Sequence, residues 1–457
     1  MSAPTNAASN EESDAVYAPP KVGDAKEGAA AAVIATPAYT GPARPYPRIF
    51  WVALLLEFLE RLAYYGVYIN LAVYLTGTVG LTDRENGVLL GVFALVRSWV
   101  PVGTGAFADR IGFRWSLTTS FVLYALSDLV LYVSPSRPGA WAAVMGMAVA
   151  GAFLKPVIPA SVRRYAPEER RTEGFSYFYS SVNAGSVVGK VLTKIVRGMM
   201  GLRTSILNAV VACVIGVGLA ISLFKEPEAP KDASGGDSTV EPPKDGIVEM
   251  LGAIAGFFTN GRLMLFLVLI SGYYLLIEQF YQTFPTYIVR MFGEDAPREY
   301  ITLINPAAIA LFGVLVGRVT KQIPAPYAIS LGVLVGAAAM LLMGAVPSLY
   351  GACGAFFVFA VAEMILSPRY YEYFSSFAPK GREAMYMGFA VTPLGIGGLI
   401  GGVLSGYLIS LYLPKEGDKS PLVVWGFYAA IGVVSAATLA IYGRWALNKD
   451  RTEKAAS

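Results

Sequence analysis

The first long apolar segment of the chain is interrupted by charged residues. Glu57, Glu60 and Arg61 lie within five residues of one another, and Tyr64 and Tyr65 follow them. Residues three or four positions apart share one face of a helix, so positions 57, 60, 61 and 64 would form a single polar stripe. Two carboxylates beside one guanidinium leave an excess negative charge, which needs another cation or a bound proton. The pattern therefore favours a functional role over a packing salt bridge.

Four later apolar segments also contain ionisable residues. These ionisable residues are Arg97, Lys155, Glu278, Glu363 and Arg369. A charged side chain at the centre of a membrane helix costs about 2.5–3.5 kcal/mol, so an unpaired one facing lipid is disfavoured. Lys155 and Glu278 are each isolated in their segments, so their partners must come from other helices. Such pairs can form in one conformation and break in the next, whereas a permanent Lys155–Glu363 pair is the structural alternative.

Two further lysines, Lys190 and Lys194, lie late in their apolar segment. Long basic side chains near a helix end can extend to the membrane surface while their stems stay in the apolar layer. We expect both to reach the outer interface in this way, without a functional role.

The composition indicates a membrane protein. Hydrophobic residues make up 55% of the 457 residues and charged residues 15%, which leaves too little polar surface for a soluble protein. Apolar stretches of spanning length occur at 50–75, 86–107, 116–134, 140–161, 174–197, 203–224, 262–290, 299–318, 325–346, 349–374, 384–412 and 421–446. We therefore expect an all-α membrane protein with twelve transmembrane helices.

A polar segment separates these stretches into two sets of six. Residues 225–260 are rich in Pro, Ser, Gly and Asp, as expected of a linker. The predicted parts are a disordered cytoplasmic tail over 1–47, bundles over 48–224 and 261–446, and a cytoplasmic tail over 447–457. Lys and Arg are more frequent in segments that face the cytoplasm if both termini lie inside, so we predict that orientation.

Several kinds of chemistry are excluded by composition. The chain has no His, and Cys213 and Cys353 lie within apolar runs, so imidazole catalysis and thiolate metal sites are not expected. A net charge of +4 is too small to indicate nucleic-acid binding. We expect no enzyme activity, cofactor or metal, and we expect the protein to act as a monomer in the lipid bilayer.

A motif of glycines and charges follows the second apolar stretch. It consists of Gly105, Asp109, Arg110, Gly112 and Arg114. The glycines permit a tight turn, and the carboxylate can accept hydrogen bonds at a neighbouring helix N-terminus. The pattern resembles the loop signature of the major facilitator superfamily. Basic residues that only follow the positive-inside rule would explain the arginines but not the spacing. The resemblance implies the fold of that superfamily, with two six-helix bundles that alternate access to a site between them.

A second resemblance extends over nearly the whole membrane domain. Residues 57–66, Glu-Phe-Leu-Glu-Arg-Leu-Ala-Tyr-Tyr-Gly, resemble the signature E-x-x-E-R-F-x-Y-Y-G of proton-dependent oligopeptide transporters, a family within that superfamily. Only Leu62 differs. Further motifs of the family follow in order, at Lys155-Pro156, Phe175–Ser186, Glu278-Gln279, Asn305-Pro306 and Glu363–Pro368. The chain is therefore identified as a divergent member.

This resemblance implies proton-driven uptake of di- and tripeptides across a bacterial-type inner membrane. The assigned residues are Arg61, Lys155 and Asn183 for the peptide carboxylate, Asn305 and Glu363 for its amino group, Tyr64 and Tyr65 for the pocket wall, and Glu57 and Glu60 for proton binding, with Arg61, Lys155, Glu278 and Glu363 also in the coupling set. The chemistry is coherent, because a zwitterion needs cations at one end and a carboxylate at the other.

Several pocket positions depart from the family pattern. The family's Arg two residues after Tyr-Tyr-Gly is Tyr68 here, so Arg97 is a candidate to replace it as the partner of Glu278. The other departures are Ser98 for a tyrosine, Ala390 for a tryptophan, and Arg369 for a small residue. Arg97 and Arg369 are therefore added to the candidate binding residues.

The departures leave the substrate open. The sequence supports symport of small peptides or of a related zwitterion or anion. The alternative is a major-facilitator carrier or antiporter of a non-peptide metabolite or drug, and a non-transporting receptor is a third possibility.

Overall fold

The computed structural model describes residues 44–101, 103–104, 111–167, 170–225, 256–378, 386 and 389–456. Most of the predicted N-terminal tail and of the predicted linker lies outside these residues. The first group of helices is α1 (Arg48–Gly77), α2 (Asp83–Trp99), α4 (Phe113–Val133), α5 (Arg137–Leu154), α6 (Val157–Tyr165), α7 (Arg171–Met200), α8 (Leu202–Ser205) and α9 (Leu207–Ser222). The second is α11 (Gly261–Gln282), α12 (Phe284–Phe292), α13 (Arg298–Ile301), α14 (Ile304–Thr320), α15 (Ala325–Ala345), α16 (Leu349–Ser375), α18 (Thr392–Tyr412) and α19 (Pro421–Ala456).

Several helices begin at residues that cap their free N–H groups. The Thr82 hydroxyl accepts from the backbone of Glu85, whose carboxylate accepts from Thr82 in return, so α2 starts with a capping box. Asn260 accepts from the backbone N–H of Leu263 at 3.1 Å at the start of α11. Ser348 has the same role for α16. These caps place the helix starts at polar residues between the apolar stretches.

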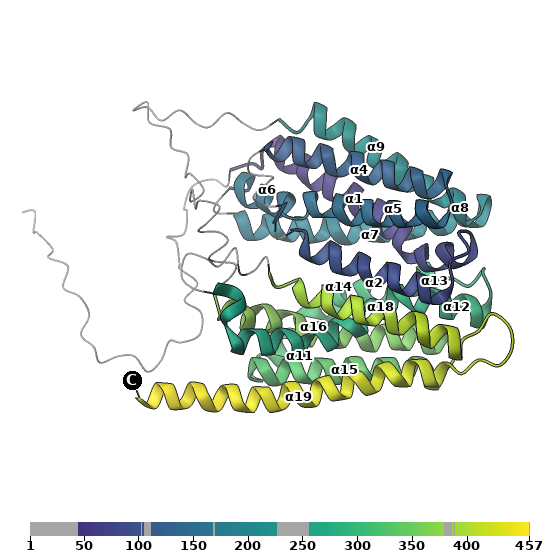
Figure 1. The fold of residues 1–457 in the computed structure, drawn as a ribbon. Coiled ribbons are helices and arrows are strands. Elements are labelled where there is room, and N and C mark those ends of the chain that lie inside the picture. Colours follow the sequence, from purple (N-terminus) through teal and green to yellow (C-terminus); the bar gives the residue numbers. More distant parts are fainter. Residues whose placement is uncertain are drawn as a thin grey trace, which may run out of the picture. The chain divides into compact units, whose positions relative to one another are not determined.

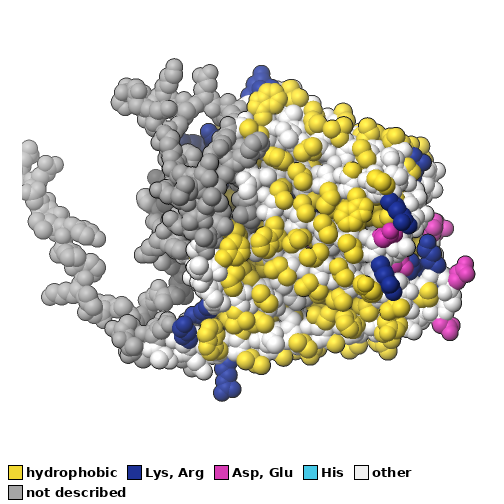
Figure 2. All heavy atoms as spheres, in the orientation of Figure 1, with side chains coloured by type: hydrophobic (Ala, Val, Ile, Leu, Met, Phe, Trp, Pro, Cys, Tyr) yellow, Lys and Arg dark blue, Asp and Glu magenta, His cyan; other side chains and the backbone are white. Residues whose placement is uncertain are grey.

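The length and composition of the helices fit a protein that crosses the membrane many times. Within the described residues, eight segments are long and apolar enough to cross a membrane. Four more helices, α1, α2, α7 and α14, are either shorter or carry the charges noted above, and together with the eight they are consistent with the predicted twelve. On the face seen in Figure 2, hydrophobic side chains cover the middle and charged side chains gather toward the ends of the helices.

The two groups of helices pack as two bundles. Helices α1–α9, the N-terminal bundle, lie together in the upper part of Figure 1, and α11–α19, the C-terminal bundle, lie below them. Buried apolar side chains form one large cluster within residues 49–224 and another within 257–446. The segment after residue 446, predicted to be a cytoplasmic tail, continues α19 as far as Ala456.

Helices α2 and α18 join the bundles through glycines. Gly87 and Gly91 in α2 face Gly402 and Gly406 in α18, so each helix presents a glycine every four residues. A Cβ atom on Gly87 would lie 2.3 Å from the carbonyl oxygen of Gly402. The two backbones can therefore approach closely only because these side chains are absent.

Polar contacts between the bundles gather near the short helix α13. Arg197 of α7 donates two hydrogen bonds to Glu299, at 2.8 and 3.1 Å. Asn70 of α1 donates to the same carboxylate at 3.1 Å and accepts from Arg298 at 2.5 Å. Glu299 and Arg298 are almost fully buried, at 0% and 1% exposed. We call this group of four residues the α13 contact.

The glycine contact predicts an asymmetric response to added methyl groups. Gly87→Ala should lower the stability of the detergent-purified protein by about 1–3 kcal/mol, because the new Cβ overlaps the backbone of α18. Gly218→Ala in α9 is the matched control, since a Cβ there meets nothing within 4 Å. That variant should be neutral or more stable. The apparent melting temperature checks both, and equal shifts would contradict the packing argument.

Candidate functional site

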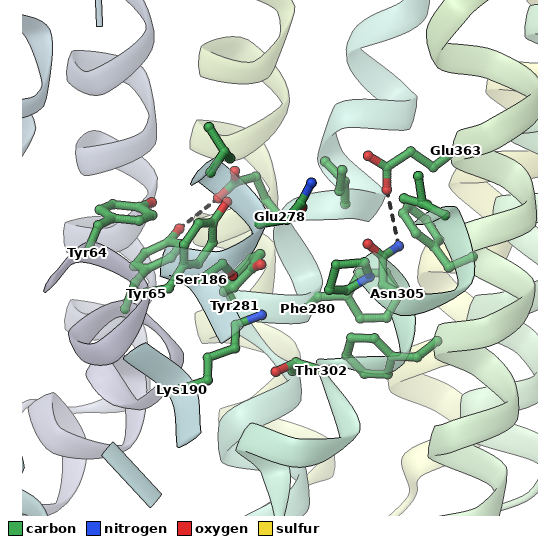
Figure 3. Close-up of a pocket in the computed structure, with 18 of the residues that line it drawn as sticks. Tyr64, Tyr65, Ser186, Lys190, Glu278, Phe280, Tyr281, Thr302, Asn305 and Glu363 are labelled. Carbon is green, nitrogen blue, oxygen red and sulfur yellow. Dashed lines mark hydrogen bonds between the residues drawn. The ribbon is translucent and has the colours of Figure 1, made fainter. Parts of the chain in front are cut away.

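A cavity of about 270 Å³ lies between the two bundles. The N-terminal bundle contributes polar residues from α1, α2 and α7, namely Tyr64, Tyr65, Tyr68, Arg97, Asn183, Ser186 and Lys190. The C-terminal bundle contributes polar residues from α11, from α14 and the residues just before it, and from α16, namely Glu278, Tyr281, Thr302, Asn305 and Glu363. Figure 3 shows these side chains meeting from both sides. Cationic groups thus come from one bundle and carboxylates from the other.

An ion pair crosses the cavity between Arg97 and Glu278. The Nη2 atom of Arg97 lies 3.0 Å from Oε1 of Glu278, and the two side chains are 11% and 5% exposed. The other carboxylate oxygen accepts from the Tyr68 hydroxyl at 2.8 Å, and Arg97 donates to the Tyr64 hydroxyl at 2.6 Å. Arg97 on α2 thus occupies the place next to Glu278 for which the sequence named it, and Tyr68 adds a hydrogen bond.

The charged stripe of α1 forms a compact cluster inside the N-terminal bundle. Arg61 Nε lies 2.9 Å from Glu57 and 2.6 Å from Glu60, and Glu60 also accepts from the Tyr124 hydroxyl of α4 at 3.0 Å. Gly185 of α7 lets the two helices approach, because a Cβ there would lie 2.8 Å from Cβ of Arg61. One guanidinium therefore serves two buried carboxylates. This cluster is not part of the cavity lining.

Lys155 lies at the break between α5 and α6, directly before Pro156. Its ammonium donates to the backbone carbonyl of Arg97 at 3.4 Å, and Lys155 does not line the cavity. Among the residues that the structure describes, no ion pair joins Lys155 to Glu363. Lys155 supports the segment of α2 that carries Arg97.

On the opposite wall, Asn305 of α14 donates to Glu363 of α16 at 3.1 Å, and both residues line the cavity (Figure 3). Arg369 lies six residues further along α16 and faces elsewhere. It forms an ion pair of 2.5 Å with Glu372 and donates to the Lys321 carbonyl at 2.8 Å. The structure thus places Arg369 outside the cavity, because six residues along a helix lead to a different face.

On α7, Asn183 lines the cavity as the sequence suggested, whereas Lys190 was expected at the outer interface. The structure corrects the second expectation. Lys190 is 2% exposed and lines the cavity, while Lys194 reaches the carbonyl of Asp295 at 3.1 Å. The spacing along the helix could have predicted this position, because Ser186 and Lys190 follow Asn183 by three and seven residues and therefore share its face.

The loop motif is described only in part. Gly105, Asp109 and Arg110 lie outside the described residues. Gly112 has a φ of +83°, a conformation that favours glycine, immediately before α4. Arg114 donates to the Ile221 carbonyl near the end of α9 and lies over the Trp115 ring at 5.7 Å. The described part of the motif therefore connects the starts and ends of neighbouring helices.

Comparison with known proteins agrees with the two-bundle fold. Residues 53–392 match the family described as Major Facilitator Superfamily. The chain belongs to this superfamily. A crystal structure of a peptide transporter POT in complex with sulfate aligns with a TM-score of 0.69 and 16% identity, over 89% of this chain and 98% of that one. The likeness shows the shared fold.

Two curated relatives differ in what they cover. The dipeptide and tripeptide permease B of Xenorhabdus bovienii is 28% identical over 183 residues, which is 39% of this chain and 36% of the permease. The matched segment thus spans about a third of that relative. The multidrug resistance protein MdtH of Salmonella typhimurium is 22% identical over 405 residues, 88% of this chain and 94% of that protein. The comparisons therefore establish the superfamily.

The Arg97–Glu278 pair predicts strong coupling between two distant positions of the chain. Arg97→Met leaves a buried carboxylate with only the Tyr68 hydroxyl, so stability should fall by about 3–5 kcal/mol. The double variant Arg97→Met/Glu278→Met should lose less than the two single variants summed. Apparent unfolding free energies in detergent measure the cycle.

An exposed ion pair serves as the control for that cycle. Arg137 and Glu85 lie 3.1 Å apart, with side chains 59% and 38% exposed. Arg137→Ala should cost only about 0–1 kcal/mol. Additive effects of the Arg97 and Glu278 substitutions would contradict a direct interaction.

Proposed function

We propose that the protein is a proton-coupled symporter that moves a small zwitterionic solute, such as a di- or tripeptide, by alternating access. The observation that carries the proposal is the opposition of charges across one cavity. Lys190 reaches the cavity from the N-terminal bundle, and Glu363 reaches it from the C-terminal bundle. A zwitterion that binds both would link the bundles, and its release would let them separate.

Proton coupling is supported by the cluster on α1. Glu57 and Glu60 are 3% and 1% exposed and share Arg61, so the cluster carries one negative charge more than it can pair locally. A bound proton removes that excess at low cost in a site screened from water. The cluster thus has the charge imbalance that a proton carrier requires.

A continuous set of contacts links the cluster to the cavity. The Arg61 guanidinium lies 5.9 Å from the Tyr64 ring, and Tyr64 accepts from Arg97, which pairs with Glu278 across the bundles. Protonation next to Arg61 would change how strongly its charge acts on this route. The same contacts could therefore couple proton binding to the joining of the two bundles.

Alternating access requires contacts that hold one end closed. The α13 contact joins α1 and α7 to the C-terminal bundle through Arg197, Asn70 and Glu299. With both termini in the cytoplasm, this end would face outward. We propose that these buried contacts close the outer end and break when the transporter opens outward.

A carrier of another solute is the second candidate. The match to the multidrug resistance protein covers 88% of this chain, whereas the match to the permease covers 39%. A thermal-shift panel of dipeptides, amino acids, nucleotides and carboxylates separates the two. Stabilisation by carboxylates without a response to any peptide would favour this candidate.

Proton dependence is tested in liposomes that contain the purified protein. Uptake of labelled alanyl-alanine should require an inward proton gradient and should fall at least tenfold in Glu57→Gln, because the cluster then has no excess charge to neutralise. Glu85→Gln is the control, since Gln also completes the cap of α2. Uptake by the unmodified protein that ignores the gradient would reject proton coupling.

A further inference from the structure

Lys190 is a buried cation that has no compensating anion within the part of the chain that the structure describes. Its side chain is 2% exposed, and the ammonium projects into the cavity (Figure 3). The rings of Tyr65 and Tyr281 lie beside the ammonium, with their centroids 5.1 and 5.9 Å from Nζ. Among the described residues, no carboxylate forms an ion pair with it. Burial of a bare ammonium is costly, so a retained one indicates a ligand that supplies the missing charge.

The other cations near the cavity already have partners. Arg97 is paired with Glu278 at 3.0 Å. Arg61 is held by its two carboxylates, and Lys155 donates to a backbone carbonyl. An incoming carboxylate would have to displace an existing contact at each of these groups. At Lys190, among the contacts of the described residues, it would displace only the weak attraction of two aromatic faces.

The opposite wall offers the complementary charge. Glu363 is contacted by the amide of Asn305 at 3.1 Å, and a neutral amide does not cancel the charge of a carboxylate. Lys190 and Glu363 therefore bring one cation and one anion to the same cavity from different bundles. A ligand with separate positive and negative ends satisfies both.

We propose that Lys190 is the residue that binds the carboxylate of the transported solute, while Glu363 binds its ammonium group. The inference rests on the proposed function and moves the carboxylate site from Arg61 and Lys155 to α7. The cavity volume of about 270 Å³ lies just below the range of about 300–1,000 Å³ usual for small-molecule sites. The solute is therefore a zwitterion of the size of an amino acid or a dipeptide.

The two tyrosine rings orient the Lys190 ammonium without occupying its hydrogen-bond donors. Tyr65 comes from α1 and Tyr281 from α11, so the rings beside Lys190 belong to different bundles. Aromatic faces attract a cation but provide no fixed hydrogen-bond acceptor at that position. Lys190 is thus oriented toward the cavity while its hydrogen-bond donors stay available.

The test compares alanyl-alanine with its C-terminal amide, which lacks the carboxylate. Binding to the full-length purified protein is measured by calorimetry for the unmodified chain, Lys190→Met and Lys190→Arg. The unmodified protein should prefer the acid. Lys190→Met should weaken binding of the acid by about tenfold to a hundredfold, as expected for loss of a charge-assisted hydrogen bond, and leave the amide unchanged. Lys190→Arg should keep the preference for the acid.

The control is Lys194→Met, four residues along the same helix, whose ammonium contacts the carbonyl of Asp295 rather than the cavity. It should leave the affinity for both compounds unchanged. Equal weakening of acid and amide in Lys190→Met, or no change in either, would overturn the assignment of Lys190 even if the unmodified protein takes up alanyl-alanine with protons. Absence of proton-driven uptake by the unmodified protein would instead reject the proposed function, and the assignment with it.

Discussion

Charge compensation across the bundle interface organises this protein. Arg97 and Glu278 come from different bundles and meet at 3.0 Å in a buried position. Neither charge would be stable there alone, because the interior screens charges weakly and removing one partner leaves the other without compensation. The positions of α2 and α11 are therefore tied together at the level of the cavity. Tyr64 and Tyr68 complete the arrangement by binding one member of the pair each.

This constraint separates the charges that hold the structure together from those left for a ligand. Arg97 is paired with Glu278, and Arg61 is paired with the two carboxylates of the α1 cluster within the N-terminal bundle. What remains in the cavity is an ammonium on α7 and a carboxylate on α16, each without a full counter-charge among the described residues. The proposed site for a zwitterion depends on the placement of these two groups on opposite bundles. Glycines in α2 and α18 permit the close approach that this placement requires.

Much of this could be predicted from sequence because membranes impose simple rules. Long apolar stretches must form helices in lipid, since every backbone polar group has to be satisfied within the segment. Charges inside such stretches are expected to face the protein interior, and Arg97, Glu278 and Glu363 line the cavity. The loop motif from Gly105 to Arg114 led to the superfamily that the comparison of residues 53–392 established.

Which basic side chains face the cavity was decided by tertiary structure alone. Lys190 lines the cavity, whereas Arg61 and Lys155, which are also basic, do not. Arg369 is turned away from the cavity, although it shares a helix with Glu363. Sequence spacing determines which residues share a helix face, but the neighbour of that face depends on how the helices pack. Hydropathy does not show which neighbouring helix a given face packs against. From sequence, the buried Lys190 on α7 therefore resembled a lysine that extends to the membrane surface.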